Sequence, residues 1–148
     1  MAPATFCFAA DNTAPDRTVF LALAQAFEDL GVRAYKGGAA ALMSNKTLLT
    51  AALNIHSVEA RHAAYWRTVR GEKAWITLAQ TTVPGAGSGV YGKSGNPVAS
   101  FPSESNISQG GVAAGFSSVT SPALISEAFD EPLDAASVLE LTAPFGVR

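Results

Sequence analysis

The chain has 148 residues, the size of one ordinary domain, of which 48% are hydrophobic and 15% are charged. This composition supports a folded core and excludes a wholly disordered protein. The formal net charge is −2 and no run of basic residues is present, so we expect neither nucleic acid nor a membrane as a partner.

The first 14 residues are predicted to form an extended N-terminal segment. Met1–Ala10 is apolar, but it lacks a basic start and is too short to span a membrane. We therefore expect no signal peptide and no transmembrane helix, and the default location is the cytoplasm. Cys7 is the only cysteine, which excludes an internal disulfide framework, and we interpret it as a small buried thiol.

A first helix is predicted from about Pro15 to Ala34. Its candidate caps are Asn12, Thr13 and Asp16. Apolar residues recur along it at steps of three and four, which makes one stripe on the helix surface. The stripe consists of Phe20, Leu23, Phe27, Leu30 and Ala34. Gly37 and Gly38 are then expected to end the helix or to turn the chain.

The second helix has the clearest signals. Ser44 or Asn45 can cap its start, and Gly71 stands directly after Arg70, where a glycine commonly ends a helix. A length of about 25 residues gives a rod of roughly 37 Å, which suits a helical bundle. The connection to the first helix is short, so we expect an antiparallel hairpin over residues 15–70. The apolar stripe of this helix consists of Leu48, Ala52, Ile55, Glu59, His62 and Trp66.

Residues 71–148 are predicted to form an irregular, loop-rich C-terminal extension, so that the fold class is mainly α. Trp75–Ala79 is consistent with a short strand or with an extended segment packed on the helices. Residues 84–121 contain eight of the 13 glycines, and we expect a long loop or a disordered insert there. Short helical turns are predicted at Pro122–Phe129 and at Asp134–Leu141, the second capped by its first residue.

A carboxylate and an imidazole interrupt the apolar stripe of the second helix. Glu59 and His62 are three residues apart, so they share one face, one turn from each other. Burying them is costly unless they are paired, and a metal ion is one suitable partner. Glu28 on the first helix can face them, with Asp29 as its neighbour on the more exposed side. The sequence thus predicts three metal ligands.

Other interpretations stay open at this point. Glu-x-x-His occurs by chance in many helices, where the two side chains are solvated or simply hydrogen-bonded to each other. His56 lies three residues before Glu59, either as a competing ligand or as a residue on the flank. Arg61 and Arg67 are expected to point away from the stripe into solvent.

Three segments resemble a ferritin-like family that includes plant desiccation-related proteins and fungal stress-response relatives. Phe27–Ala39 and Ala52–Ala64 are similar to family signatures, and Phe129–Asp134 is similar to an element of its C-terminal extension. The resemblance covers half of the chain. It implies a desiccation-related or stress-related protein with a ferritin-like four-helix bundle, and relatives of this kind are often secreted.

The resemblance also implies roles for the three ligand candidates. Glu28 corresponds to the carboxylate of the third bundle helix, and Glu59 and His62 correspond to the Glu-x-x-His pair of the fourth. The implied cofactor is a di-iron or di-manganese centre, with iron or manganese as the metal. The first Glu and the first Glu-x-x-His of the family pattern have no counterpart here, so this region resembles the C-terminal half of a bundle.

Two amphipathic helices cannot cover both of their own apolar faces. Three explanations are open: an incomplete product, a homodimer of two hairpins that rebuilds a four-helix bundle, or coverage of the face by the C-terminal extension. Oxidase-type chemistry is expected only where a second half-bundle completes the site. The alternative functions are a structural or interaction protein that keeps the hairpin without metal, and an unrelated helical interaction hairpin.

Overall fold

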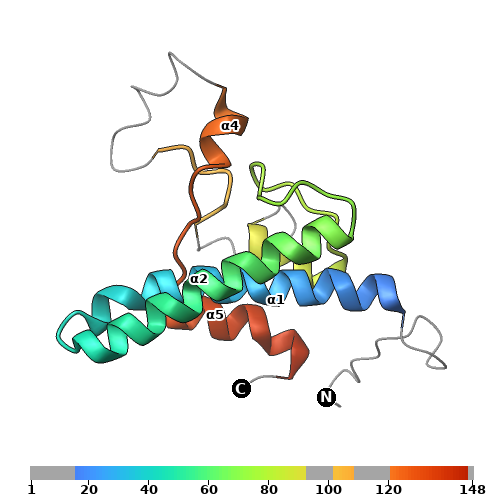
Figure 1. The fold of residues 1–148 in the computed structure, drawn as a ribbon. Helices are drawn as coiled ribbons and strands as arrows, with labels where there is room; N and C mark the ends of the chain where they lie inside the picture. Colours follow the sequence, from blue (N-terminus) through green and yellow to red (C-terminus); the bar gives the residue numbers. More distant parts are fainter. Residues whose placement is uncertain (1–15, 93–101, 109–120, 147–148) are drawn as a thin grey trace.

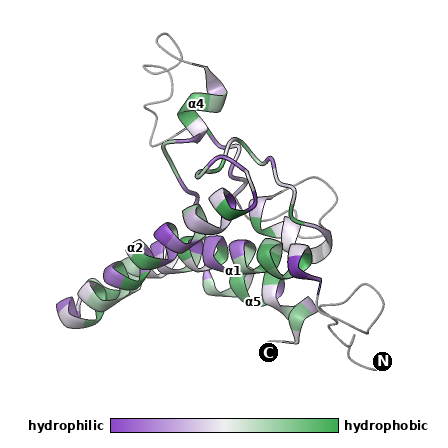
Figure 2. Cartoon of the chain, turned by 45° about the vertical axis from the view of Figure 1, so that its right-hand side comes forward, coloured by the Kyte–Doolittle hydropathy of each residue, from purple (hydrophilic) through white to green (hydrophobic). Residues whose placement is uncertain are grey.

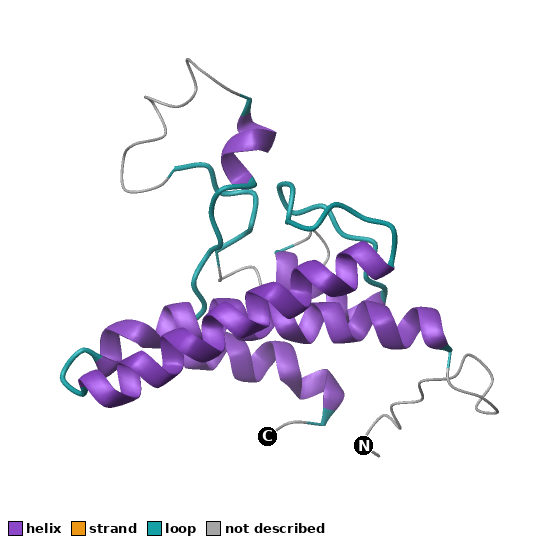
Figure 3. Ribbon diagram, in the orientation of Figure 1, coloured by secondary structure: helices purple, strands orange, loops and turns teal. Residues whose placement is uncertain are grey.

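The computed structural model describes residues 16–92, 102–108 and 121–146. Over these residues the chain consists of helices and loops, without a strand (Figure 3). Two long helices lie side by side as an antiparallel hairpin, and shorter segments of the C-terminal extension pack along it (Figure 1). The mainly α fold and the helical hairpin predicted from the sequence are confirmed.

Helix α1 comprises Arg17–Gly38 and is capped by Asp16, whose carboxylate accepts a hydrogen bond from the Thr18 N–H at 2.8 Å. The helix continues for one turn beyond its predicted end at Ala34 and ends at Gly38, so the expectation that Gly37 and Gly38 end the helix holds. Gly37 serves close packing there, because a Cβ at this position would overlap the backbone carbonyl of Leu133. A single 3-10 turn, η1 (Ala39–Leu42), follows α1.

Helix α2 comprises Lys46–Val69. Its cap is Asn45, whose side-chain oxygen accepts a hydrogen bond from the Leu48 N–H at 3.1 Å. Of the two caps that the sequence offers, Asn45 is therefore the one that is used, and Ser44 is not. Gly71 follows the end of the helix with φ of 76°, a backbone conformation that glycine adopts without strain.

The buried face of α2 is rotated from the predicted stripe. The residues that α2 buries are Ala52, Ala63 and Arg67. Of the predicted α2 stripe, Ala52 is buried as expected, whereas Leu48 and Ile55 are exposed. Of the predicted α1 stripe, Leu23 and Leu30 are buried as expected, whereas Phe20 and Phe27 are exposed. Figure 2 shows hydrophobic and hydrophilic residues interspersed along α2. The stripe therefore straddles two sides of the helix: one packs on α1, and the other is left open by the described residues.

The core forms between α1 and the C-terminal extension. Its members are Ala22, Ala26, Leu30, Ile76, Val83, Val90, Tyr91, Leu133 and Leu141. Gly85–Tyr91 forms a 3-10 helix, η2, whose last residue is almost completely buried. This part of residues 84–121 therefore differs from the expected loop or disordered insert. Residues 93–101 and 109–120 of that segment lie outside the described residues.

The remaining segments follow the sequence signals in part. Trp75–Ala79 contains no strand and packs on the hairpin through Ile76, as the extended alternative requires. Helix α4 (Pro122–Ser126) projects from the hairpin, and α5 (Ala135–Thr142) crosses α1 (Figure 1).

Helix α5 begins where the sequence predicts. Asp134 caps it as predicted and accepts a hydrogen bond from the Ser137 N–H at 2.8 Å. Its buried residues are Leu141 and Thr142, Val138 packs against the core, and Leu139 is exposed. None of the described helices combines the length and the apolar character that crossing a membrane requires. Cys7 lies outside the described residues.

Candidate metal centre

Glu28 of α1 and His62 of α2 meet across the hairpin. His62 Nδ1 lies 3.2 Å from Glu28 Oε1. The side chains keep 55% and 26% of their surface exposed, respectively, so the pair stands at the open side of the two helices. The sequence predicted His62 on the core-facing side, and this is wrong, because the rotation of α2 carries the imidazole outward.

Glu59 lies deeper, between the two helices. A Cβ added to Gly31 would come within 2.5 Å of Glu59 Cδ, so the carboxylate rests directly against the backbone of α1. Its Oε2 atom is buried and lacks a hydrogen-bond partner among the described residues. Burial raises the pKa of Glu59, the negative charge of Glu28 raises it further, and His62 lowers it. The Oε2 atom of Glu59 is thus buried without a hydrogen-bond donor, near the carboxylate of Glu28 and the imidazole of His62.

The three predicted ligands fit part of a metal site. Carboxylate oxygens and an imidazole nitrogen are donors that iron and manganese accept, and one buried oxygen of Glu59 has no hydrogen-bond partner among the described residues. Over the described ranges, no group of three or more His, Cys, Asp or Glu side chains is gathered closely enough to hold a metal ion. Glu28, Glu59 and His62 are therefore neighbours in an open arrangement and do not form a closed ligand shell.

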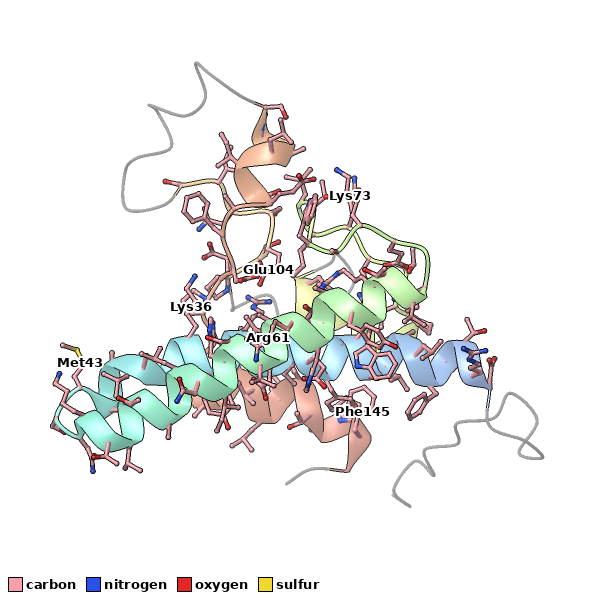
Figure 4. All side chains as sticks on the ribbon, in the orientation of Figure 1. Lys36, Met43, Arg61, Lys73, Glu104 and Phe145 are labelled. Atoms are coloured by element: carbon pink, nitrogen blue, oxygen red, sulfur yellow. The ribbon has the colours of Figure 1, made fainter. Side chains whose placement is uncertain are left out.

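The flanking residues of α2 divide into two groups. His56 is half-buried, and Arg61 is exposed on α2 as expected (Figure 4). Arg67 is buried and binds Asp29 through two guanidinium nitrogens, one of them at 2.9 Å. Both expectations for this pair, a solvated Arg67 and an Asp29 on the more exposed side, are wrong. They failed because each residue finds its partner only once the two helices are placed against each other.

A hydrogen-bonded network extends from this ion pair into the C-terminal extension. The Tyr91 hydroxyl donates to Asp29 Oδ2 at 2.6 Å, and the Gln25 amide donates to the Tyr91 hydroxyl at 3.2 Å. Burial raises the pKa of Asp29, and the positive charge of Arg67 opposes the rise. Such a pair is costly to break, because removing one partner leaves the other charge buried and unpaired.

A cavity of about 180 Å³ adjoins this ion pair. Its walls include Val32, Ala63, Ile76 and Ser126. Asp29 and Arg67 bind each other at its edge, and Tyr91 binds Asp29 as well. The charged groups of this cavity therefore serve to join the C-terminal extension to the hairpin.

A second buried ion pair lies further along α1. Arg33 Nε is 2.8 Å from both the Glu131 carbonyl oxygen and Glu104 Oε1. The Arg33 guanidinium also donates to the carbonyl oxygens of Val90 and Pro102. Burial raises the pKa of Glu104 to about 7. One side chain of α1 thus holds three segments of the C-terminal extension. In Figure 4, Glu104 lies on the opposite side of the hairpin from Phe145.

Comparison with protein families identifies part of the chain. Residues 1–72 match the family model of the ferritin-like domain, a region that includes α1, η1 and α2 with all three ligand candidates. Neither the curated proteins nor the solved structures contain a significant match to the chain.

Proposed function

We propose that this chain is a ferritin-like protein whose hairpin is the C-terminal half of a bundle and binds a di-iron or di-manganese centre through Glu28, Glu59 and His62. The observation that carries the proposal is the buried, unpartnered oxygen of Glu59 beside the Glu28–His62 pair. A buried acceptor without a donor is costly, and a cation relieves that cost. The ferritin-like match over residues 1–72 supports the same reading.

The three donors suit a carboxylate-rich dinuclear centre. In bundle proteins of this chemistry, two helices each give one Glu, and the two others each give a Glu-x-x-His pair. In the proposed site, Glu59 and Glu28 supply carboxylate oxygens and His62 supplies an imidazole nitrogen. Bound iron or manganese would supply redox chemistry. Oxidase-type catalysis lies outside the proposal, because the described residues supply one Glu and one Glu-x-x-His pair of the ligand set.

Metal analysis after purification tests the proposal. We expect iron or manganese to copurify with the chain and to be lost in both Glu59→Ala and His62→Ala. His56→Ala is the matched control, because it removes the other histidine of the same helix and should leave the metal content unchanged. Metal that persists in both ligand variants would contradict the assignment.

The segments Phe27–Ala39 and Ala52–Ala64 extend the proposal to a role in desiccation or stress tolerance, since these segments resemble relatives with such roles. Survival after drying is the measurement: cells that lack the chain should survive less well, and the His62→Ala chain should restore survival only in part. Full restoration by His62→Ala would separate the stress role from the metal.

A second candidate function is a non-catalytic structural or interaction protein. The 3.2 Å approach of His62 to Glu28 favours it, because the two groups already satisfy each other without a metal. In this case the purified chain contains no metal, and its melting temperature stays constant when iron or manganese is added, since a ligand that binds the folded state raises that temperature.

A further inference from the structure

A cavity larger than the one beside Asp29 lies between the hairpin and the segment that follows α2. Its volume of about 320 Å³ is at the lower end of the range of about 300–1,000 Å³ that ligand pockets occupy. Gln25 and Arg67 of the two helices form one wall, and side chains of residues 72–82 form the other. In Figure 4, Lys73 of this segment lies on the side of the hairpin from which α4 projects. The cavity shares no residue with the candidate metal centre.

The charged side chains in the walls of this cavity are paired. The pairs are Arg67–Asp29, Arg70–Glu72 (Nη2 to Oε1, 3.2 Å) and Lys73–Glu127 (Nζ to Oε1, 2.8 Å). A charged ligand would therefore find its counter-charge already taken, and burying an ion without a counter-charge is costly. The ligand that this cavity suits is neutral.

Hydrogen bonds hold one polar wall in place. Arg70 donates to Gln25 and, at 2.6 Å, to Thr82 Oγ1, and Thr82 donates in turn to Glu72. The Arg70 side chain keeps 9% of its surface exposed, and its Nε atom is buried without an acceptor among the described residues. A buried donor without an acceptor is costly. Fixed polar groups and an unpaired donor suit a ligand that is rich in oxygen atoms.

The wall formed by residues 72–82 combines hydroxyl and amide groups with an aromatic ring. Thr77 and Thr81 contribute hydroxyls, and Gln80 contributes an exposed amide. Trp75 lines the same cavity and keeps 52% of its surface exposed. A sugar ring has hydroxyls along its edge and C–H groups on its faces. Its edge therefore matches the polar side chains of this wall, and its face matches the indole ring.

We propose that this cavity binds a neutral sugar of the size of one hexose, with a face of the sugar ring on Trp75 and its hydroxyls on Gln80 and the neighbouring threonines. The small volume limits the ligand to about one ring. The inference does not depend on the proposed function, because the cavity contains none of the candidate metal ligands.

Fluorescence titration with neutral hexoses tests the inference. The chain contains two tryptophans, so Trp66→Phe leaves Trp75 as the one whose emission reports on the cavity. We expect glucose, galactose or mannose to change this emission along a saturable curve. Glucuronate and glucosamine have the same ring with a negative and a positive charge, respectively. Each should bind about tenfold or more weakly than glucose, because the cavity has no unpaired charge for it.

Two aromatic substitutions are matched, and titration calorimetry compares them without a tryptophan reporter. Trp75→Ala removes the ring from the cavity and should lower the hexose affinity by about tenfold or more. Tyr65→Ala removes a ring of α2 that is 61% exposed and lies outside the cavity, so the affinity should stay unchanged. Gln80→Ala, at another exposed position of the cavity, should also weaken binding. Circular dichroism should show the same helical content in all three variants.

Three results would overturn the inference. The first is the absence of a saturable response to any of the three hexoses. The second is equal binding of the neutral and the charged sugars. The third is a hexose affinity that both Trp75→Ala and Gln80→Ala leave unchanged. Iron and manganese contents, measured separately, decide the proposed function, so either proposal can fail while the other stands.

Discussion

At the scale of single residues, the position of the Glu59 carboxylate depends on the glycine that it contacts. It rests on the backbone of α1 because position 31 is a glycine, and one of its oxygens has no donor among the described residues. A glycine inside a helix costs about 1 kcal/mol relative to alanine. This cost is offset if the space beside Gly31 is needed for the carboxylate, and the two effects can be separated by mutation.

Gly31→Ala should weaken metal binding without weakening the fold. The new Cβ would lie 2.5 Å from Glu59 Cδ, and the carboxylate, at the end of a flexible side chain, would move aside. We expect the Mn²⁺ affinity measured by titration calorimetry to fall by about tenfold or more, as with other losses of ligand orientation. The free energy of unfolding should stay constant or rise by up to about 1 kcal/mol.

Gly38→Ala is the control for Gly31→Ala, because a Cβ at position 38 of the same helix meets no atom within 4 Å. It should leave the metal affinity unchanged. Equal affinities for both alanine variants and the unmodified chain would show that the position of the Glu59 carboxylate has no part in metal binding.

At the scale of helices, the sequence predicts the features that depend on neighbouring residues and misses those that depend on residues distant in the chain. The caps Asp16, Asn45 and Asp134 act on backbone N–H groups two or three residues away, so the sequence near each helix start contains the whole interaction. The two glycines correctly marked the end of α1, but the packing role of Gly37 could not be predicted, because its contact is Leu133, which is distant in sequence.

The candidate site also has features that the sequence predicts and features that it does not. The three-residue spacing of Glu59 and His62 correctly placed the two on neighbouring parts of one helix surface. Periodicity does not tell which side of a stripe a neighbouring helix covers, so the exposure of His62 could not be predicted. The pairing of Asp29 with Arg67 depends on how α1 and α2 are aligned, and neither residue alone carries a signal for it.

The cap of α2 gives a prediction for this scale. Asn45→Ala should lower the free energy of unfolding by about 1 kcal/mol, because the N–H group of Leu48 would lose its acceptor. Ser44→Ala is the control, since Ser44 was the rival cap in the sequence and lies one residue outside the observed one. Urea denaturation of both variants measures the difference, and equal losses in the two would contradict the assignment of the cap.

At the scale of the whole molecule, the ion pairs Asp29–Arg67 and Arg33–Glu104 fasten the C-terminal extension to the hairpin. Leu48 and Ile55 of α2 are exposed, so the described residues of the C-terminal extension cover only part of the apolar surface of the hairpin. A molecule fastened in this way should unfold in one transition, with the buried ionisable groups setting how its stability depends on pH.

Glu104 supplies the test of this coupling. Its pKa is about 7 in the folded chain against 4.5 as the ordinary value, because burial outweighs the attraction of Arg33, while Asp130 adds to the rise. Between these values the folded chain keeps a proton that the unfolded chain has lost. The contribution of Glu104 to stability is therefore fully present below pH 4.5 and is lost as the pH rises to about 7. At about 1.4 kcal/mol per pH unit, the loss is at most about 3.5 kcal/mol.

Glu104→Gln should remove this pH dependence, because the amide keeps the shape and the acceptor oxygen of the side chain but does not titrate. The comparison is urea denaturation of both proteins at pH 5 and at pH 7.5. The unmodified chain should lose more stability between the two pH values than the variant, since the difference between the proteins cancels the titration of all other groups.

The C-terminal extension and the hairpin should unfold together at both pH values, because Arg33 of α1 also holds the backbone carbonyls of Val90, Pro102 and Glu131. Parallel losses of stability in the two proteins would show that Glu104 keeps its ordinary pKa and that its contact with Arg33 does not control the fastening.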